Sequence, residues 1–299
     1  VTDDGYYLTM QRIPHVVRED NPPLLFSAPK PAVLLQHGLV LEGSNWVTNL
    51  PNSSLGFILA DAGYDVWIGN SRGNSWSRKH KEFEFHDQEY SAYSFHEMAM
   101  YDLPAMINYI LQKTGQEQLF YVAYSQGTTT GFIAFSSIPE LDRKIKMFFA
   151  LAPVTTSSNM KSPLVRVFDL PEGMIKVCPC HISLCDVYLS HYPDSTSIKN
   201  ILHWRQVISP AFLPQVTLFV FQTTPPFYEL ENMKAPVAAW YGGRDWLSVP
   251  EDVNITLPRI TNVVHKKYIP EFVHFDFLWS VQAYEQVYKE IVELMEKNT

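Results

Sequence analysis

The chain has 299 residues, of which 46% are hydrophobic and 14% aromatic, and this is enough to build one large globular domain. A formal net charge of −8 without a basic stripe argues against nucleic acid as a partner. No stretch reaches the roughly 18 consecutive apolar residues of a membrane-spanning helix, so we predict no transmembrane segment.

Residues 1–30 predict a pair of strands and a Pro-rich connection, with one strand over residues 5–10 after an Asp-Gly turn. The chain begins at Val1 without Met and without a signal peptide, which we interpret as a processed or truncated start. We therefore cannot predict the compartment from a targeting segment.

A short apolar run at residues 32–36 predicts a buried strand that ends in His37, Gly38 and Leu39. Glycine lets the backbone turn so that a main-chain N–H can face a developing negative charge, as an oxyanion-hole loop requires. An ordinary turn at the end of a strand would have the same sequence. We expect the ring of His37 to brace this loop.

The next elements alternate between helix and strand. Residues 55–62 predict a helix, residues 64–68 a strand, residues 75–92 a polar surface loop, and residues 95–112 a second helix despite Pro104.

Residues 119–122 predict a buried strand, Ser125 follows in a tight turn, and residues 131–135 have helical potential. This arrangement of strand, turn and helix is typical of a nucleophile elbow. Small residues are needed on both sides of the serine because the turn is sharp and the helix packs close to the strand. The usual pattern is Gly-x-Ser-x-Gly, and here Ala123 replaces the first glycine while Gly127 is kept. Since such short motifs also occur by chance, an acid and a base are needed elsewhere in the chain.

Another strand is predicted at residues 145–151, and with it the alternation indicates a mostly parallel sheet with helices on both faces. Ligands of such sheets gather at the carboxyl ends of the strands, where the predicted elbow and the His-Gly turn both lie.

The alternation stops at residues 155–233, which we interpret as an inserted cap over the strand ends. Its aromatic and aliphatic residues suit an apolar lining, although a poorly packed segment would have the same composition. The segment holds all three cysteines, Cys178, Cys180 and Cys185. If the chain is exported, we expect one disulfide and one free thiol, with Cys178 and Cys185 as candidates and the pairing left open. Their spacing matches no zinc pattern, so we expect no metal and no cofactor.

The alternation resumes with a strand at residues 235–241, after which Asp245 lies on a loop. A last strand is predicted at residues 263–268 and is followed by His274, and residues 282–297 predict an amphipathic helix.

Ser125, Asp245 and His274 thus follow three strands in the chain order expected of α/β-hydrolases. Serine is a weak nucleophile at neutral pH, so a neutral imidazole must accept its proton, and a carboxylate must hold that imidazole in the correct tautomer. The backbone N–H groups of Leu39 and Gln126 would bind the oxyanion.

Three other aspartates are weaker candidates for the acid. Asp276 lies two residues from His274 and is better interpreted as a support for that loop, whereas Asp65 and Asp102 fall at the wrong ends of their elements. Two N-x-S/T sequons, at Asn52 and Asn254, are candidate glycosylation sites if the chain enters a secretory route.

Long stretches across nearly the whole chain resemble the mammalian acid lipases, the family that contains gastric, lysosomal and epidermal lipases. The stretches that carry the resemblance are residues 35–39, 49–55, 57–67, 69–74, 101–105, 125–129, 149–154 and 200–204.

The resemblance implies one α/β-hydrolase domain over residues 1–299 with a cap at residues 155–233, shortened between about residues 161 and 178. It implies a serine hydrolase that cleaves acyl esters of neutral lipids, such as triacylglycerol or cholesteryl ester, at a lipid–water interface. It also implies Ser125, Asp245 and His274 as the triad, and a glycoprotein that is secreted or lysosomal.

Two alternative hypotheses remain. A truncated or non-catalytic relative would keep the triad but lack a working lid, and a peptidase or small-ester esterase would keep the fold with another substrate.

Overall fold

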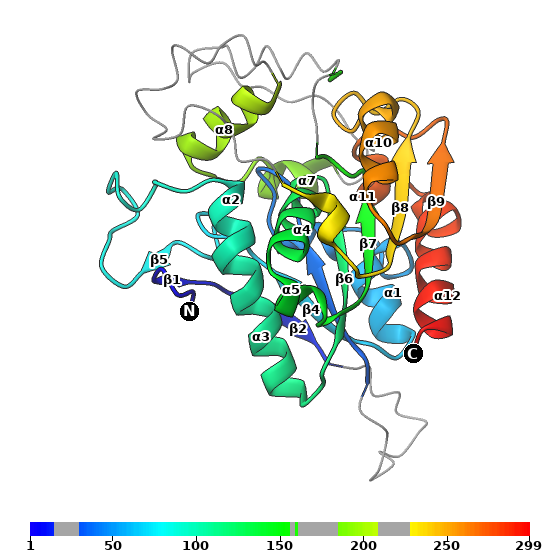
Figure 1. The fold of residues 1–299 in the computed structure, drawn as a ribbon, viewed down its shortest axis with the longest axis horizontal. Helices are drawn as coiled ribbons and strands as arrows, with labels where there is room; N and C mark the ends of the chain where they lie inside the picture. Colours follow the sequence, from blue (N-terminus) through cyan, green and yellow to red (C-terminus); the bar gives the residue numbers. More distant parts are fainter. Residues whose placement is uncertain (15–29, 156–158, 161–184, 209–227) are drawn as a thin grey trace.

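The computed structural model describes residues 1–14, 30–155, 159–160, 185–208 and 228–299. A seven-stranded sheet with the order β2-β4-β3-β6-β7-β8-β9 forms its centre (Figure 1). Neighbouring strands are parallel, except that β2 runs antiparallel to β4. The strands of this sheet are β2 (Met10–Ile13), β3 (Ala32–Gln36), β4 (Asp65–Gly69), β6 (Leu119–Tyr124), β7 (Ile145–Leu151), β8 (Val237–Gly242) and β9 (Val263–Ile269).

Helices connect the strands and pack on the sheet. The α-helices are α1 (Leu55–Asp61), α2 (Phe95–Glu97), α3 (Leu103–Thr114), α4 (Gln126–Ser137), α5 (Pro139–Asp142), α7 (Cys185–His191), α8 (Ile198–Ile208), α10 (Pro250–Thr256), α11 (Asp276–Trp279) and α12 (Lys289–Lys297). Short 3-10 helices are η1 (Gly43–Trp46), η2 (Pro51–Ser53), η5 (Leu230–Asn232) and η6 (Leu257–Arg259), and the π-helical turns are η3 (Met98–Asp102) and η7 (Tyr284–Tyr288).

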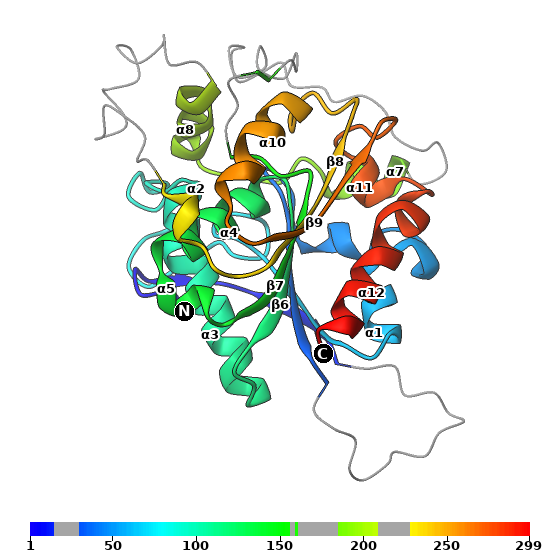
Figure 2. The ribbon, with the colours of Figure 1, turned by 45° about the vertical axis from the view of Figure 1, so that its right-hand side comes forward.

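The sheet is covered on both faces, with α3, α4 and α5 on one side and α1 and α12 on the other (Figure 2). Successive strand residues therefore enter two separate hydrophobic cores. On β6, Tyr121 and Ala123 face the first core, while Phe120 and Val122 face the second. This burial on both faces explains why the strands are near-continuous apolar runs, and it confirms the mostly parallel α/β architecture.

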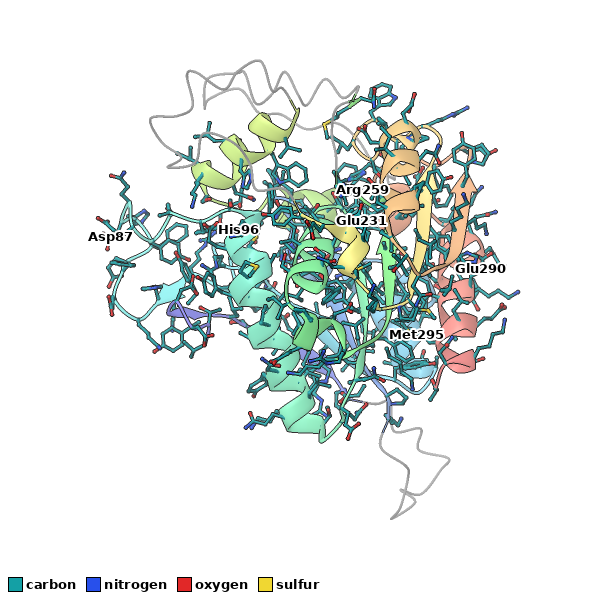
Figure 3. The ribbon with its side chains drawn as sticks, viewed as in Figure 1. Asp87, His96, Glu231, Arg259, Glu290 and Met295 are labelled. Atoms are coloured by element: carbon teal, nitrogen blue, oxygen red, sulfur yellow. The ribbon has the colours of Figure 1, made fainter. Side chains whose placement is uncertain are left out.

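An ion pair joins two of the short helices. Figure 3 shows Arg259 beside Glu231, and the Arg259 Nε atom lies 2.8 Å from Glu231 Oε1, so that an ion pair joins η6 to η5. No helix among the described residues is both long and apolar enough to span a bilayer.

The predicted pair of strands near the N-terminus is present, but the expected bounds of a single strand at residues 5–10 were wrong. The segment forms two short strands in different sheets, since β1 (Tyr6–Tyr7) pairs with β5 (Lys79–His80) and β2 pairs with β4. Between them, the Thr9 N–H donates to Ser77 Oγ at 3.0 Å and Thr9 Oγ1 donates to the Trp76 carbonyl at 2.7 Å, which takes the backbone out of the ladder.

The predicted surface loop at residues 75–92 is also more ordered than expected. It supplies β5, and its Tyr90 is 1% exposed because it packs with Tyr6 and Tyr93 in a small third core.

Candidate active site

Ser125 lies at the turn between β6 and α4, with φ 53° and ψ −122°. Residues other than glycine rarely adopt this strained backbone conformation, which persists only where the surrounding structure holds it in place. The Ser125 N–H donates to the Leu151 carbonyl at 3.0 Å, which ties the turn to β7. A Cβ atom on Gly127 would lie 2.7 Å from the His37 carbonyl oxygen, so only glycine fits here against the end of β3. The structure thus has the geometry of the predicted elbow.

The three predicted triad residues meet at the carboxyl edge of the sheet. His274 Nε2 lies 2.8 Å from Ser125 Oγ, and His274 Nδ1 lies 2.8 Å from Asp245 Oδ2. Because an ionised carboxylate only accepts, Nδ1 carries the proton, which leaves Nε2 free to accept the hydroxyl proton of Ser125. His274 is 7% exposed and Asp245 is 2% exposed, so the pair is shielded from bulk water.

Asp245 is held by its own loop. Its Oδ1 accepts backbone N–H groups from Leu247 at 2.9 Å and Ser248 at 2.8 Å, so the carboxylate keeps one oxygen directed at His274. On the other side, Tyr124 Oη donates to the His274 carbonyl at 3.0 Å. These supports were not found from the sequence, because the two backbone donors carry no residue signature and Tyr124 lies 150 residues before His274.

All three rejected aspartates have structural partners away from the imidazole of His274. Asp276 Oδ2 accepts the Val273 N–H at 2.7 Å, so it supports the His274 loop as expected. Asp102 is buried with Arg72, whose Nε lies 2.7 Å from Asp102 Oδ1 and whose Nη1 lies 2.6 Å from Asp4 Oδ2. Burial raises the pKa of Asp102, and the nearby Arg72 charge opposes that rise. Arg72 therefore joins Asp102, at the end of η3, to Asp4 in the N-terminal segment.

The third rejected aspartate, Asp65, pairs with Arg12 across β2 and β4, with Arg12 Nε 2.8 Å from Asp65 Oδ1. Hydrogen bonding to Asp65 raises the pKa of Arg12.

The two predicted oxyanion donors belong to segments that meet at the serine, since a Cβ atom on Gly38 would lie 3.0 Å from Ser125 Cβ. Leu39 lies in the loop after β3, and Gln126 is the first residue of α4, where helical N–H groups have no intrahelical acceptor. Among the described residues, neither backbone N–H has a hydrogen-bond acceptor. The geometry therefore leaves both donors available at the elbow.

The ring of His37 braces the Leu39 loop, as its position in the sequence predicts. His37 Nε2 accepts the Ser71 N–H at 3.1 Å, so the ring proton is on Nδ1, which donates to the Gly38 carbonyl at 2.8 Å. Burial lowers the pKa of His37, which keeps the ring neutral and this tautomer in place. Val40, which follows Leu39 in this loop, has φ 52°, and its carbonyl accepts the Asp194 N–H at 2.8 Å.

Sequence reasoning missed two residues that contact Gln126. Asn200 and Trp204 on α8 both donate to its side-chain oxygen, at 2.9 Å and 2.6 Å. They lie 74 and 78 residues further along the chain, and their only signal was a polar residue and an aromatic one within the stretch 200–204.

Several predictions fall largely outside the described residues. Most of the predicted cap at residues 155–233 is not described, nor are Cys178 and Cys180, and Cys185 is described only as the start of α7. Among the described residues, no three His, Cys, Asp or Glu side chains gather as metal ligands would. Asn52 and Asn254 are both exposed, in η2 and α10 respectively.

A hydroxyl, a base and an orienting carboxylate are hydrogen-bonded in series, near two N–H groups without an acceptor among the described residues, and this is the arrangement that acyl transfer requires. The sheet order and this series of residues place the chain in the α/β-hydrolase class. A family described as "alpha/beta hydrolase fold" matches residues 31–175, and one described as "Partial alpha/beta-hydrolase lipase region" matches residues 1–50. The fold is also that of a monoacylglycerol lipase from Paleococcus ferrophilus, with a TM-score of 0.60 at 19% identity over 98% of this chain and 100% of the other.

The chain belongs to the acid lipase family. It is 46% identical to the lysosomal acid lipase/cholesteryl ester hydrolase of Macaca fascicularis, over 99% of this chain and 86% of the relative. It is 44% identical to lipase member M of Homo sapiens, over 99% of this chain and 81% of the relative. The first alignment spans 347 positions although this chain has 299 residues, so the relative carries segments that this chain lacks.

Proposed function

We propose that the protein is a serine carboxylic-ester hydrolase, a lipase that cleaves acyl esters of neutral lipids through an acyl-serine intermediate. The observation that carries the proposal is the hydrogen-bonded series from Ser125 Oγ to His274 Nε2 and from His274 Nδ1 to Asp245 Oδ2, with both distances at 2.8 Å. Family membership adds the substrate class, since the relatives are named as lipases and one of them also as a cholesteryl ester hydrolase.

In the first half of the reaction, Ser125 Oγ attacks the ester carbonyl carbon while His274 Nε2 takes the hydroxyl proton. The carbonyl oxygen becomes an oxyanion, which accepts hydrogen bonds from the backbone N–H groups of Leu39 and Gln126. His274 then gives its proton to the departing alcohol oxygen, and the carbon–oxygen bond of the ester breaks. Asp245 stabilises the imidazolium that forms between these two transfers.

In the second half, His274 accepts a proton from water, and the resulting hydroxide attacks the acyl carbon bound to Ser125. The same two N–H groups bind the second oxyanion. His274 then returns the proton to Ser125 Oγ, and the fatty acid leaves.

Because the relatives are named as lipases, we propose esters of long acyl chains at a lipid–water interface as substrates. We also propose that residues 155–233 form a cap inserted in a single hydrolase domain. We also propose a secretory or lysosomal route with glycans at Asn52 and Asn254, because one relative is named as lysosomal and both asparagines are exposed. To test the glycans, the mass of the protein is measured before and after glycosidase treatment. The treatment should lower the mass of the wild type, and this decrease should become smaller in Asn52→Gln and in Asn254→Gln.

A non-catalytic relative is the second candidate, because the relatives carry segments that this chain lacks. Hydrolysis of chromogenic esters of rising acyl length separates the candidates, with Ser125→Ala as the control. A lipase hydrolyses long-chain esters best and loses this activity with Ser125, a small-ester esterase prefers short chains, and a non-catalytic relative hydrolyses none.

A further inference from the structure

The described part of the predicted cap contacts the core at one of the two proposed oxyanion donors. Helix α8 lies beside α2 at the carboxyl end of the sheet (Figures 1 and 2). From α8, Asn200 Nδ2 and Trp204 Nε1 donate to the same atom, Gln126 Oε1, at 2.9 Å and 2.6 Å. The two donors are four residues apart and so lie on the same face of the helix.

This contact fixes the orientation of the Gln126 side chain. Gln126 is 4% exposed, and both of its neighbours on α8 are donors, so only the amide oxygen satisfies them. The amide nitrogen is directed to Met98, with Nε2 3.6 Å from Sδ. A flipped amide would bring N–H groups against N–H groups in a buried place, at a large cost.

The donors are themselves held rigidly. Asn200 is fully buried, its Oδ1 accepts the Phe95 N–H at 2.8 Å, and its second amide hydrogen goes to Thr196 Oγ1 at 3.0 Å. Trp204 is 5% exposed and packs on the ring of Phe95, with ring centroids 5.0 Å apart. A movement of either donor would therefore break contacts with α2 as well.

The anchored residue is the one that follows the strained serine. Ser125 has φ 53° and ψ −122°. A flip of the Ser125–Gln126 peptide plane would change ψ, bring Ser125 towards the left-handed helical region and so relax its strain. The same flip would turn the Gln126 N–H away from the oxyanion. Two hydrogen bonds on the Gln126 side chain oppose this rotation, because they hold the first residue of α4 from outside the helix.

We propose that Asn200 and Trp204 are positioning residues, which hold Gln126 so that its backbone N–H is directed at the oxyanion, and that α8 thereby couples the cap to catalysis. The inference rests on the proposed ester hydrolase function. A positioning role concerns the transition state, in which the oxyanion exists, more than the ground state.

The experiment uses Trp204→Phe, which removes the N–H donor and keeps an aromatic ring against Phe95, and Asn200→Ser as a second variant. Ile198→Ala is the matched control, since Ile198 lies on α8 but is 65% exposed. For Trp204→Phe we expect kcat on a chromogenic ester to fall about tenfold with KM within about twofold, less than the loss of a whole oxyanion donor. Inhibition by a trifluoromethyl ketone, whose serine adduct carries an oxyanion, should weaken in proportion, and Ile198→Ala should match the wild type.

A double-variant cycle separates positioning from general damage. If Trp204 acts through Gln126, then Trp204→Phe has less than about a twofold further effect on kcat in a Gln126→Leu background. A wild-type kcat in Trp204→Phe, or effects that multiply in the double variant, would overturn the inference. A wild-type chain that hydrolyses no ester would instead refute the proposed function on which the inference rests.

Discussion

Replacement of Gly127 by alanine tests whether the elbow must lie directly against the Leu39 loop. A methyl group there would meet the His37 and Gln36 carbonyl oxygens at 2.7 Å and 2.8 Å, whereas ordinary contacts begin at 3.4 Å. Both atoms belong to the backbone at the end of β3, so α4 and the oxyanion loop must separate by roughly half an ångström. Overpacking of this kind lowers the free energy of unfolding by about 1–3 kcal/mol, and the higher helix propensity of alanine offsets up to about 1 kcal/mol of that loss.

We therefore expect Gly127→Ala to lower the free energy of unfolding by about 1–2 kcal/mol and to lower kcat about 100-fold, because small displacements of reacting groups have large kinetic effects. Gly131→Ala is the matched control. It lies one turn further along α4, where a methyl group would meet Tyr121 Cε1 at 2.7 Å and Phe148 Cζ at 3.0 Å, both side-chain atoms away from the serine.

Urea denaturation gives the stability of each variant, and initial rates on a short chromogenic ester, per folded molecule, give kcat. Gly131→Ala should lose stability while the folded protein keeps its kcat. The reasoning is refuted if Gly127→Ala keeps the wild-type kcat, or if both variants lose activity equally.

Four further predictions concern single side chains. Burial lowers the pKa of His203 to about 4, so the unfolded chain binds a proton that the folded chain does not, and stability falls by up to about 3 kcal/mol as the pH drops from 6.5 towards 4. His203→Gln should flatten the unfolding free energy over that range in urea titrations, and an unchanged slope would contradict the assignment. Asp102→Asn should cost about 1–3 kcal/mol because the buried Arg72 loses one of its two carboxylate partners and keeps Asp4, with kcat kept in the folded fraction. Asp245→Asn should instead keep the stability and lower kcat by about 10⁴, and the reverse pattern would identify Asp102 as the acid. Ala123→Gly, which restores the usual glycine of the elbow, should lower the free energy of unfolding in urea by about 0.5–1 kcal/mol and leave kcat unchanged. A changed kcat would show instead that the methyl group of Ala123 takes part in the turn.

The sequence predicted the central elements well because their signals are local. The strands at residues 32–36 and 145–151 have the observed bounds of β3 and β7, since strands buried on both faces are uninterrupted apolar runs. The helix at residues 95–112 is observed in three parts, α2, η3 and α3, which end at Thr114 before Gly115. The π-helical turn at Met98–Asp102 was not predicted, although it ends two residues before Pro104, which lacks the backbone N–H that a regular helix needs.

The division of the N-terminal strands between two sheets was not predicted, because their partners are distant in the sequence. Tyr6–Tyr7 and Lys79–His80 are each only two residues long, too short for a pattern, and they form a sheet because the chain brings them together. Pairing of this kind depends on tertiary structure, and residue preferences do not encode it.

At the site, the order of Ser125, Asp245 and His274 was accessible because each residue has a distinct chemistry and follows a strand. The anchors of Gln126 were not accessible, since hydrogen bonds between residues so far apart depend on where α8 packs. The sequence therefore predicts which groups meet at the candidate site, and the fold determines how they are held.

The most direct test of the central claim is labelling of the purified chain with a fluorophosphonate, followed by peptide mapping. We predict a covalent adduct on Ser125 in the wild type, with no adduct in Ser125→Ala and a strongly reduced rate of labelling in His274→Ala. Labelling that is absent from the folded wild type, or that persists at another residue in Ser125→Ala, would contradict the assignment of Ser125 as the nucleophile.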